Sequence, residues 1–371
     1  MLFNGHLDKT LRNMGFTSCT FDPCLYLHKK SGAYLVVVVD DMVLASPSVE
    51  FSTQFYKDLS SKYDVKDLGE PSYVIGVRVD ISPDSVKFTQ DRYISDLFAL
   101  HQPGDKPTNT PATPNQVLCA SGIHKDDESP LLSDPSQYRS LVGGLMYTLI
   151  TRPDVATATS ICARYVQSPR EAHLEAAKRI LRFLHHTRQR PLVYTTCKSS
   201  NVVIKAFVDS SWGNDIDTRR SRFGYAIFVG RSLVAWCSKL HPALAMSSAE
   251  AEYTAATEAT KAIKWIVSLI SFLGIKPQTP VELYEDNAAC RIMAATSQVS
   301  GRNKHFELRQ HFIRNHVTAG LIKMLPVNTK DQIADIFTKP TVRPIFEKHA
   351  AALLQGLPDN FLSGPTVEGG C

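Results

Sequence analysis

Four acidic residues in the C-terminal half of the chain have the types and positions that metal-dependent hydrolysis requires: Asp209, Glu252, Asp286 and Asp335. Hydrolysis of a phosphodiester uses one ion to activate water and a second, about 4 Å away, to stabilise the leaving oxygen. Mg²⁺ and Mn²⁺ bind carboxylate oxygens, so no histidine or cysteine is needed. Each acid alone is better explained by an ordinary strand end or an exposed position, because acidic residues at element ends are common. The four in this order instead predict a catalytic site with two divalent ions.

The elements expected around these acids alternate between strands and helices. We expect strands at 202–209, 223–229, 233–237, 281–285 and 321–326, a long helix from 247 to about 274, and a terminal helix from 329 onward. Asp209 and Asp286 then stand at strand ends, and Asp335 lies on the terminal helix. Three strands followed by helix, strand, two helices, strand and helix predict a mixed sheet with helical crossovers.

Glu252 is an acid whose position local structure does not explain. It shares a helix face with Ala256 and Ile263, and a carboxylate on that sheet-facing stripe is costly unless it is paired or bound to metal. Glu250, in contrast, lies three residues after Ser247, which matches a capping box. We therefore expect Glu250 to cap the helix and Glu252 to bind the ions.

Seven blocks of this region closely resemble the ribonuclease H domain of copia-type LTR retrotransposon Pol polyproteins: residues 207–212, 219–225, 234–239, 247–253, 284–287, 303–314 and 331–339. The resemblance implies a ribonuclease H-type domain that cleaves RNA paired to DNA, with the four acids as catalytic metal ligands. A preference for such hybrids depends on sensing 2′-hydroxyls and is carried by the resemblance alone. Many ribonucleases H also have a histidine before the last helix. Residues 327–331 contain none, so no proton-transfer role is assigned.

Asp40 and Asp41 lie between two apolar, β-branched stretches near the N-terminus. Alone, such a pair is more often an ordinary hairpin turn. The surrounding segment looks like the palm hairpin of a copia-type reverse transcriptase, which usually reads Tyr-Val-Asp-Asp; Val38 replaces the tyrosine here. Further segments resemble the same family: 15–24, 66–70, 73–76, 88–97, 138–147, 151–154 and 176–184. Together with the seven blocks above, they extend the resemblance over nearly the whole chain, to about residue 341.

A polymerase site also needs an aspartate from an earlier palm strand, and residues 1–13 resemble the helix that follows it. We therefore expect a truncated Pol, in which Asp40 and Asp41 are a remnant and polymerase activity is lost while the ribonuclease H is retained. A complete reverse transcriptase subunit is then a candidate partner beside the RNA–DNA hybrid. Two alternatives stay open: a non-enzymatic nucleic-acid-binding remnant, and a different nuclease or integrase built on the same sheet.

Two groups of basic residues could contact a nucleic-acid backbone. The first follows Asp209 and comprises Arg219, Arg220 and Arg222; the second comprises Lys304, Arg309 and Arg314, among histidines. For each group, an ordinary solvated surface explains the charges equally well. Trp212 and Trp236 are expected to be core aromatic residues rather than platforms for base stacking.

The expected fold class is α/β (α+β): a ribonuclease H-like mixed sheet with helices, preceded by an incomplete reverse transcriptase palm and thumb and a helical connection. The expected ranges are 1–102 for the palm and thumb remnant, 103–136 for a linker, 137–198 for the helical connection, 199–345 for the ribonuclease H-like domain and 346–371 for a tail. A chain of 371 residues fits two or three such units.

Composition limits the class of protein only loosely. The net charge of +5 permits a nucleic-acid partner without requiring one. The eight cysteines include no Cys-x-x-Cys pair, which argues against a zinc site. No apolar run approaches the ~20 residues that span a bilayer, and the N-terminus does not resemble a signal peptide. We expect an intracellular protein, cytoplasmic or nuclear, with no membrane partner.

Overall fold

The computed structural model describes residues 2–114, 118–123, 128–196, 201–295 and 304–361, with only the backbone described for 2–4, 201 and 304–310. The chain divides into two compact units. Unit 1 comprises Met1–Val79 and Lys264–Pro277, and unit 2 comprises Asp80–Ile263 and Gln278–Cys371. These packing units do not follow the five ranges expected from the sequence, which remain a prediction.

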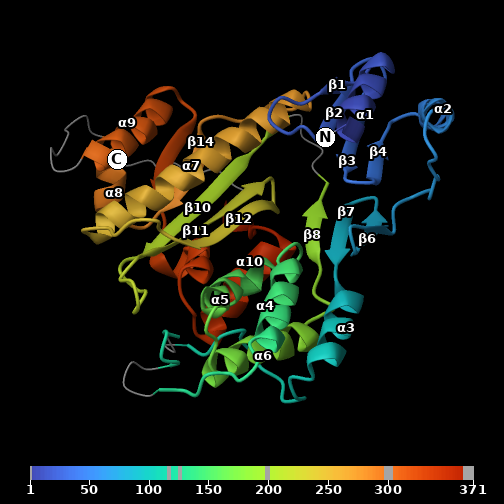
Figure 1. Cartoon of the computed structure of the whole chain (residues 1–371). Helices are drawn as coiled ribbons and strands as arrows, with labels where there is room; N and C mark the ends of the chain where they lie inside the picture. The colour runs from blue at the N-terminus through green and yellow to red at the C-terminus, as the bar shows by residue number, and fades with distance from the viewer. Residues whose placement is uncertain (1, 115–117, 124–127, 197–200, 296–303, 362–371) are drawn as a thin grey trace. The chain divides into compact units, whose positions relative to one another are not determined.

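A five-stranded mixed sheet lies in unit 2 (Figure 1). Its strands, in spatial order, are β12 (Ser232–Leu240), β11 (Arg222–Val229), β10 (Ile204–Ser211), β14 (Val281–Glu285) and β15 (Ile322–Pro326). β11 is antiparallel to both β12 and β10, β14 is parallel to β10, and β15 is parallel to β14. The expected α/β class, a mixed sheet with helices, is confirmed.

The register of β10 and β14 places two acids at one edge of the sheet. Phe207 pairs with Tyr284 in this parallel ladder. Asp209 and Asp286 each follow two residues later, so they leave the same edge of the sheet as neighbours. Because neighbouring strands are about 4.8 Å apart, the two carboxylates lie within reach of one ion.

Helix α7 (Ser248–Phe272) follows β12, and helices α8 (Ala288–Ala295) and α9 (Lys304–Thr318) follow β14. Glu250 caps α7 as expected. Its backbone N–H donates to Ser247 Oγ at 3.2 Å, while its carboxylate accepts from the N–H of Met246 at 2.8 Å. Glu250 therefore caps the start of α7, and Glu252 takes no part in this cap.

The expected helix from residue 329 is wrong. Two short 3₁₀ helices, η3 (Thr329–Asp331) and η4 (Ile333–Phe337), take its place, followed by α10 (Arg343–Gln355) and η5 (Asp359–Phe361). Gln332 separates the first two with extended backbone angles. Its side chain donates to the Val208 carbonyl of β10 at 2.9 Å and accepts from the N–H of Ala334 at 3.2 Å. This contact with the sheet replaces a turn of α-helix.

Gly224 of β11 allows η4 to lie directly on the sheet. A Cβ atom at position 224 would lie 2.2 Å from the Cβ of Phe337, far closer than two carbons can approach. Gly224 is the β11 partner of Asp209. Because residue 224 has no side chain, η4, which contains Asp335, can pack beside the end of β10.

A helical region completes unit 2 and shares its core with the sheet. Its elements are β7 (Ser85–Thr89), α3 (Asp91–His101), α4 (Ser136–Thr148), η1 (Pro153–Val155), α5 (Ala156–Cys162), η2 (Ala163–Tyr165), α6 (Glu171–His186) and β8 (Leu192–Thr195). Leu141 and Leu184 from these helices belong to one core cluster with Phe228 and Phe337. The helical region therefore stabilises the sheet by burying apolar area against it.

Arg152 and Asp154 form a buried ion pair in η1 and the residue before it. The guanidinium donates to both carboxylate oxygens, at 2.9 and 2.7 Å. It also donates to the carbonyl and the hydroxyl of Thr187, at the end of α6, at 3.1 and 2.7 Å. These contacts join two helical segments that are far apart in the sequence.

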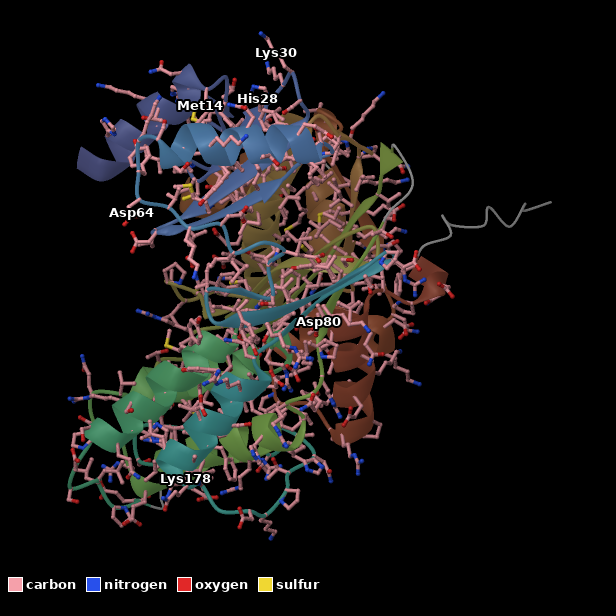
Figure 2. The ribbon with its side chains drawn as sticks, turned by 90° about the vertical axis from the view of Figure 1, so that its right-hand side faces the viewer. Met14, His28, Lys30, Asp64, Asp80 and Lys178 are labelled. Carbon is pink, nitrogen blue, oxygen red and sulfur yellow. The ribbon has the colours of Figure 1, made fainter. Side chains whose placement is uncertain are left out.

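Unit 1 contains a four-stranded sheet with two helices. Its elements are α1 (Leu2–Asn13), β1 (Thr17–Ser18), β2 (Leu25–His28), β3 (Ala33–Val38), β4 (Asp41–Ala45) and α2 (Val49–Ser60), with the strands in sequence order. Leu11, Leu35 and Phe55 lie in its core. Lys30 projects from the turn between β2 and β3 (Figure 2). The remaining short strands are β5 (Tyr73–Val74), β6 (Val77–Ser82), β9 (Asn201–Val202) and β13 (Lys276–Pro277).

Among the described residues, the helices fall short of the length and apolar character that a membrane span requires.

Replacing Asp154 by alanine should destabilise unit 2 by about 3–5 kcal/mol, because the buried Arg152 guanidinium would lose its counter-charge. Chemical denaturation followed by circular dichroism measures this loss. Glu258→Ala is the matched control, since it removes an exposed ion pair with Lys261 and should cost no more than about 1 kcal/mol. Equal effects of the two changes would contradict the structural role of the buried pair.

Candidate metal centre and nucleic-acid interface

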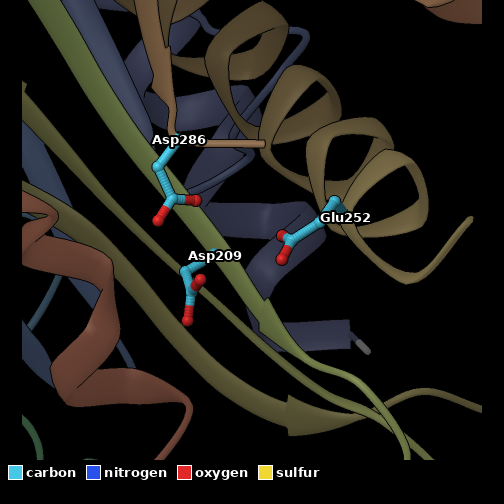
Figure 3. A group of neighbouring side chains, drawn as sticks. All are labelled: Asp209, Glu252 and Asp286. Carbon is cyan, nitrogen blue, oxygen red and sulfur yellow. The ribbon is translucent and has the colours of Figure 1, made fainter. Parts of the chain in front are cut away.

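Three carboxylates converge from three separate elements. Asp209 lies near the end of β10, Glu252 in the first turns of α7 and Asp286 directly after β14. Figure 3 shows their side chains pointing toward one another, and each offers an oxygen within 4.8 Å of the others. We call these three residues the carboxylate cluster. The structure thus brings together three of the four acids that the sequence analysis selected.

Glu252 is buried and incompletely bonded. Its Oε2 atom has no hydrogen-bond partner. Burial, followed by the nearby Glu285 and Asp209 carboxylates, raises the pKa of Glu252 to about 11. Ala256 and Ile263, on the same helix face, are fully buried. Without a cation, this position therefore favours the protonated acid.

Asp209 is held by a neighbour on the segment after η4. The Thr338 hydroxyl donates to its Oδ2 and also to the Asp335 carbonyl. Burial, followed by the Asp335 carboxylate, raises the pKa of Asp209 to about 7. On the other side of the cluster, the Thr329 hydroxyl donates to Asp286 Oδ2 at 3.1 Å. Hydroxyl donors therefore orient two of the three carboxylates.

Asp335 lies outside the carboxylate cluster. It is buried in η4, and the Lys339 ammonium donates to its Oδ1 at 2.9 Å. Burial lowers the pKa of Lys339, but the Asp209 and Asp335 carboxylates outweigh it and the pKa is raised. Asp335 therefore lies close enough to interact with Asp209, while its own charge is balanced by Lys339.

Sequence reasoning missed Glu285, at the end of β14. This residue is fully buried, and its Oε1 accepts from the N–H of Asn287 at 2.9 Å while Oε2 has no partner. Burial raises the pKa of Glu285 well above its ordinary value. Strand alternation could have found it, since Val281, Leu283 and Glu285 occupy the buried positions of β14.

The carboxylate cluster fits a hard divalent cation. Its donors are all carboxylate oxygens, which Mg²⁺ and Mn²⁺ prefer. A bound cation would also satisfy the buried Glu252 oxygen that has no partner in the protein. Carboxylates this close repel one another without a cation.

The first basic group is divided between the surface and the interior. Arg219 and Arg220 are exposed in the connection between β10 and β11. Arg222 is buried, and its guanidinium donates to the Ser160 and Ser238 hydroxyls at 2.8 and 3.3 Å. Burial lowers its pKa to about 10. We therefore withdraw Arg222 from the candidate nucleic-acid contacts, because its side chain bonds within the protein.

The second basic group lies on α9. The side chains of Lys304 and Arg309 fall outside the described residues. Arg314 is described, and its Nε donates to the Met293 carbonyl at 3.1 Å, which ties it to α8. The role of this group in nucleic-acid binding stays a prediction.

Asp40 and Asp41 lie at the β3–β4 hairpin, where Val38 pairs with Asp41. Val39 has a φ of 54°, in the left-handed region, which closes the tight turn. Both aspartates are exposed. In the described part of the chain they belong to no group of three possible metal ligands.

Comparison with known proteins identifies relatives along nearly the whole chain. The reverse transcriptase (RNA-dependent DNA polymerase) family matches residues 1–114. The retrovirus-related Pol polyprotein from transposon RE1 of Arabidopsis thaliana is 33% identical over 346 residues, which are 92% of this chain and 23% of the polyprotein. The chain thus spans about a quarter of that relative. The putative transposon Ty5-1 protein YCL074W of Saccharomyces cerevisiae is 31% identical over 263 residues, 70% of this chain and 83% of that protein.

A solved ribonuclease H1, LC11-RNase H1 in complex with an RNA/DNA hybrid, covers 36% of this chain and 93% of its own, with 14% identity and a TM-score of 0.28. The fold of this chain is defined by the strand order and register described above. The sequence relatives decide the family. This chain belongs to the copia-type retrotransposon Pol polyproteins, whose relatives include reverse transcriptases.

Proposed function

We propose that this chain is a retrotransposon-derived reverse transcriptase and ribonuclease H fragment that hydrolyses the RNA strand of RNA–DNA hybrids with divalent metal ions. The observation that carries the proposal is the convergence of Asp209, Glu252 and Asp286, together with the buried Glu252 Oε2 that has no hydrogen-bond partner. Membership of the Pol family supports a nucleic-acid substrate. An RNA–DNA hybrid is therefore the proposed partner, with a complete reverse transcriptase subunit as a further one, and the proposed place of action is inside the cell.

The carboxylate cluster would hold the metal, and Asp335 would contribute to a second position. Two Mg²⁺ or Mn²⁺ ions at such a site supply an activated water and stabilise the leaving oxygen. The protein's own residues prepare the site: Thr338 orients Asp209, and the buried stripe of α7 fixes Glu252. Lys339 balances the charge of Asp335.

For the polymerase, we propose that Asp40 and Asp41 do not support primer extension in this chain. Two-metal phosphoryl transfer needs carboxylates that converge on both ions. Within the described residues, these exposed aspartates have no third acid at ligand distance. Primer extension by the purified chain would refute this part of the proposal.

Replacing Asp209 by asparagine should reduce hybrid cleavage at least about a hundredfold while binding changes little, because a ligand is lost and the fold is kept. A labelled RNA–DNA hybrid with Mg²⁺ reports cleavage, and fluorescence anisotropy reports binding. Asp331→Asn is the matched control, since Asp331 is paired with Lys348 and does not belong to the carboxylate cluster. If the wild-type chain binds the hybrid without cutting it, the non-enzymatic remnant is the better description.

The metal-free protein should lose stability as the pH rises from 3.8, the ordinary pKa of an aspartate, toward 7, because folding raises the pKa of Asp209 to about 7. In this window the folded state binds more protons than the unfolded state, so deprotonation favours unfolding. Adding Mg²⁺ above pH 7 should restore stability, by ~2.7 kcal/mol at one hundred times its Kd.

Thermal unfolding at pH 5 and pH 8, with and without Mg²⁺, measures both effects. Asp209→Asn should weaken the pH dependence and the response to Mg²⁺. A melting temperature that does not respond to Mg²⁺ or Mn²⁺ at pH 8 would count against a metal site in the cluster.

A further inference from the structure

Trp212 is exposed beside the carboxylate cluster, although the sequence predicted a core position. It follows β10, three residues after Asp209, and 55% of its surface is exposed. An exposed tryptophan keeps a large apolar face in water, which is unfavourable unless a partner covers it. Packing in the protein core therefore does not account for the position of Trp212.

The ring of Trp212 is held in place by the connection between β12 and α7. Its Nε1 donates to the Ala245 carbonyl at 2.9 Å. The residues on either side of Ala245 are also exposed, Leu244 by 56% and Met246 by 81%. We call Trp212, Leu244 and Met246 the Trp212 patch. In the sequence, Trp212 follows Asp209 by three residues, about 10 Å of extended chain, and Met246 precedes Glu252 by six residues.

The two acids of the connection between β10 and β11 bond to η2 of the helical region and to the segment around Ala120. Asp215 is buried and accepts from the Arg164 guanidinium at 3.0 Å. Asp217 accepts from the N–H of Ala120 at 2.9 Å and from the Tyr165 hydroxyl at 3.1 Å. Both carboxylates are therefore bonded on the side of the helical region.

The basic residues of the same connection are exposed. The Arg219 backbone has a φ of 58°, and its Nη2 lies 3.6 Å from where a Cβ of Gly213 would be. The guanidinium therefore lies next to the residue that follows Trp212. Arg220 is exposed as well. A rigid apolar ring with cationic neighbours complements a sugar–phosphate backbone, which offers both apolar sugar faces and anionic phosphates.

We propose that the Trp212 patch and Arg219 form a nucleic-acid contact surface, on which the indole packs against a sugar–base face of the hybrid and Arg219 binds an adjacent phosphate. The inference rests on the proposed function and extends it to a substrate-positioning surface. A cationic side chain beside the cluster attracts the phosphates of a polyanion toward the proposed metal site. The cationic flank favours a nucleic acid over an apolar protein partner.

Fluorescence tests the contact without altering Trp212. The chain has three tryptophans, so Trp236→Phe and Trp265→Phe leave Trp212 as the sole indole. With Asp209→Asn added to keep the substrate intact, a short RNA–DNA hybrid should change the Trp212 emission in parallel with binding measured by anisotropy. Binding without any change of emission would overturn the proposal. Absence of binding would overturn the proposed function along with it.

Substitutions test the energetic role of the ring. Trp212→Ala should weaken hybrid binding about fivefold or more, while Trp212→Phe should retain most of the affinity. Trp265→Ala is the matched control, because Trp265 is 42% exposed and its Nε1 likewise donates to a backbone carbonyl, that of Phe21. Arg219→Ala should reduce the slope of log affinity against log salt by about one.

Circular dichroism and thermal unfolding establish that each variant is folded. Equal affinities of wild type and folded Trp212→Ala would refute the contact surface. If Trp265→Ala weakened binding as much as Trp212→Ala does, the effect would not be specific to the patch, and the proposal would also fail.

Discussion

Three carboxylate side chains that repel one another are held together at one edge of a sheet, and the rest of unit 2 is organised around that constraint. Their oxygens lie within 4.8 Å of one another. The protein alone does not relieve the repulsion, since the pKa values of Asp209 and Glu252 are raised and one Glu252 oxygen has no partner. A neutral residue in place of one of these acids would remove the repulsion. The arrangement is understandable if a cation supplies the missing charge.

The support for this cluster comes from elements that are distant in the sequence. The parallel pairing of β10 with β14 places Asp209 and Asp286 side by side, and α7 delivers Glu252 from a buried stripe. On the opposite side, Gly224 admits η4 onto the sheet, which brings Thr338 within reach of Asp209. The helical region shares a core with the sheet. A change in that core would therefore disturb the site without touching a ligand.

The charge near the cluster depends on which way the charged side chains point as well as on how many there are. Arg222 points into the protein and bonds to Ser160 and Ser238, whereas Arg219 and Arg220, close by in the sequence, remain exposed. The acids of the same connection, Asp215 and Asp217, bond to the helical region. The net charge of +5 of the whole chain therefore does not describe how charge is placed on this part of the surface.

The sequence by itself determined the elements and the acids they carry. Strand ends at Asp209 and Asp286, the helical stripe of Glu252 and the cap at Glu250 follow from local periodicity and spacing, which act over a few residues. Only the tertiary structure decided that Asp335 lies in a 3₁₀ helix paired with Lys339, that Arg222 is buried, and that Trp212 is exposed. The partners that set these positions are far along the chain: Val208 for Gln332, which precedes η4, Ser160 for Arg222, and Ala245 for Trp212. Local pattern contains no information about such partners, because burial and backbone geometry there are set by packing between segments.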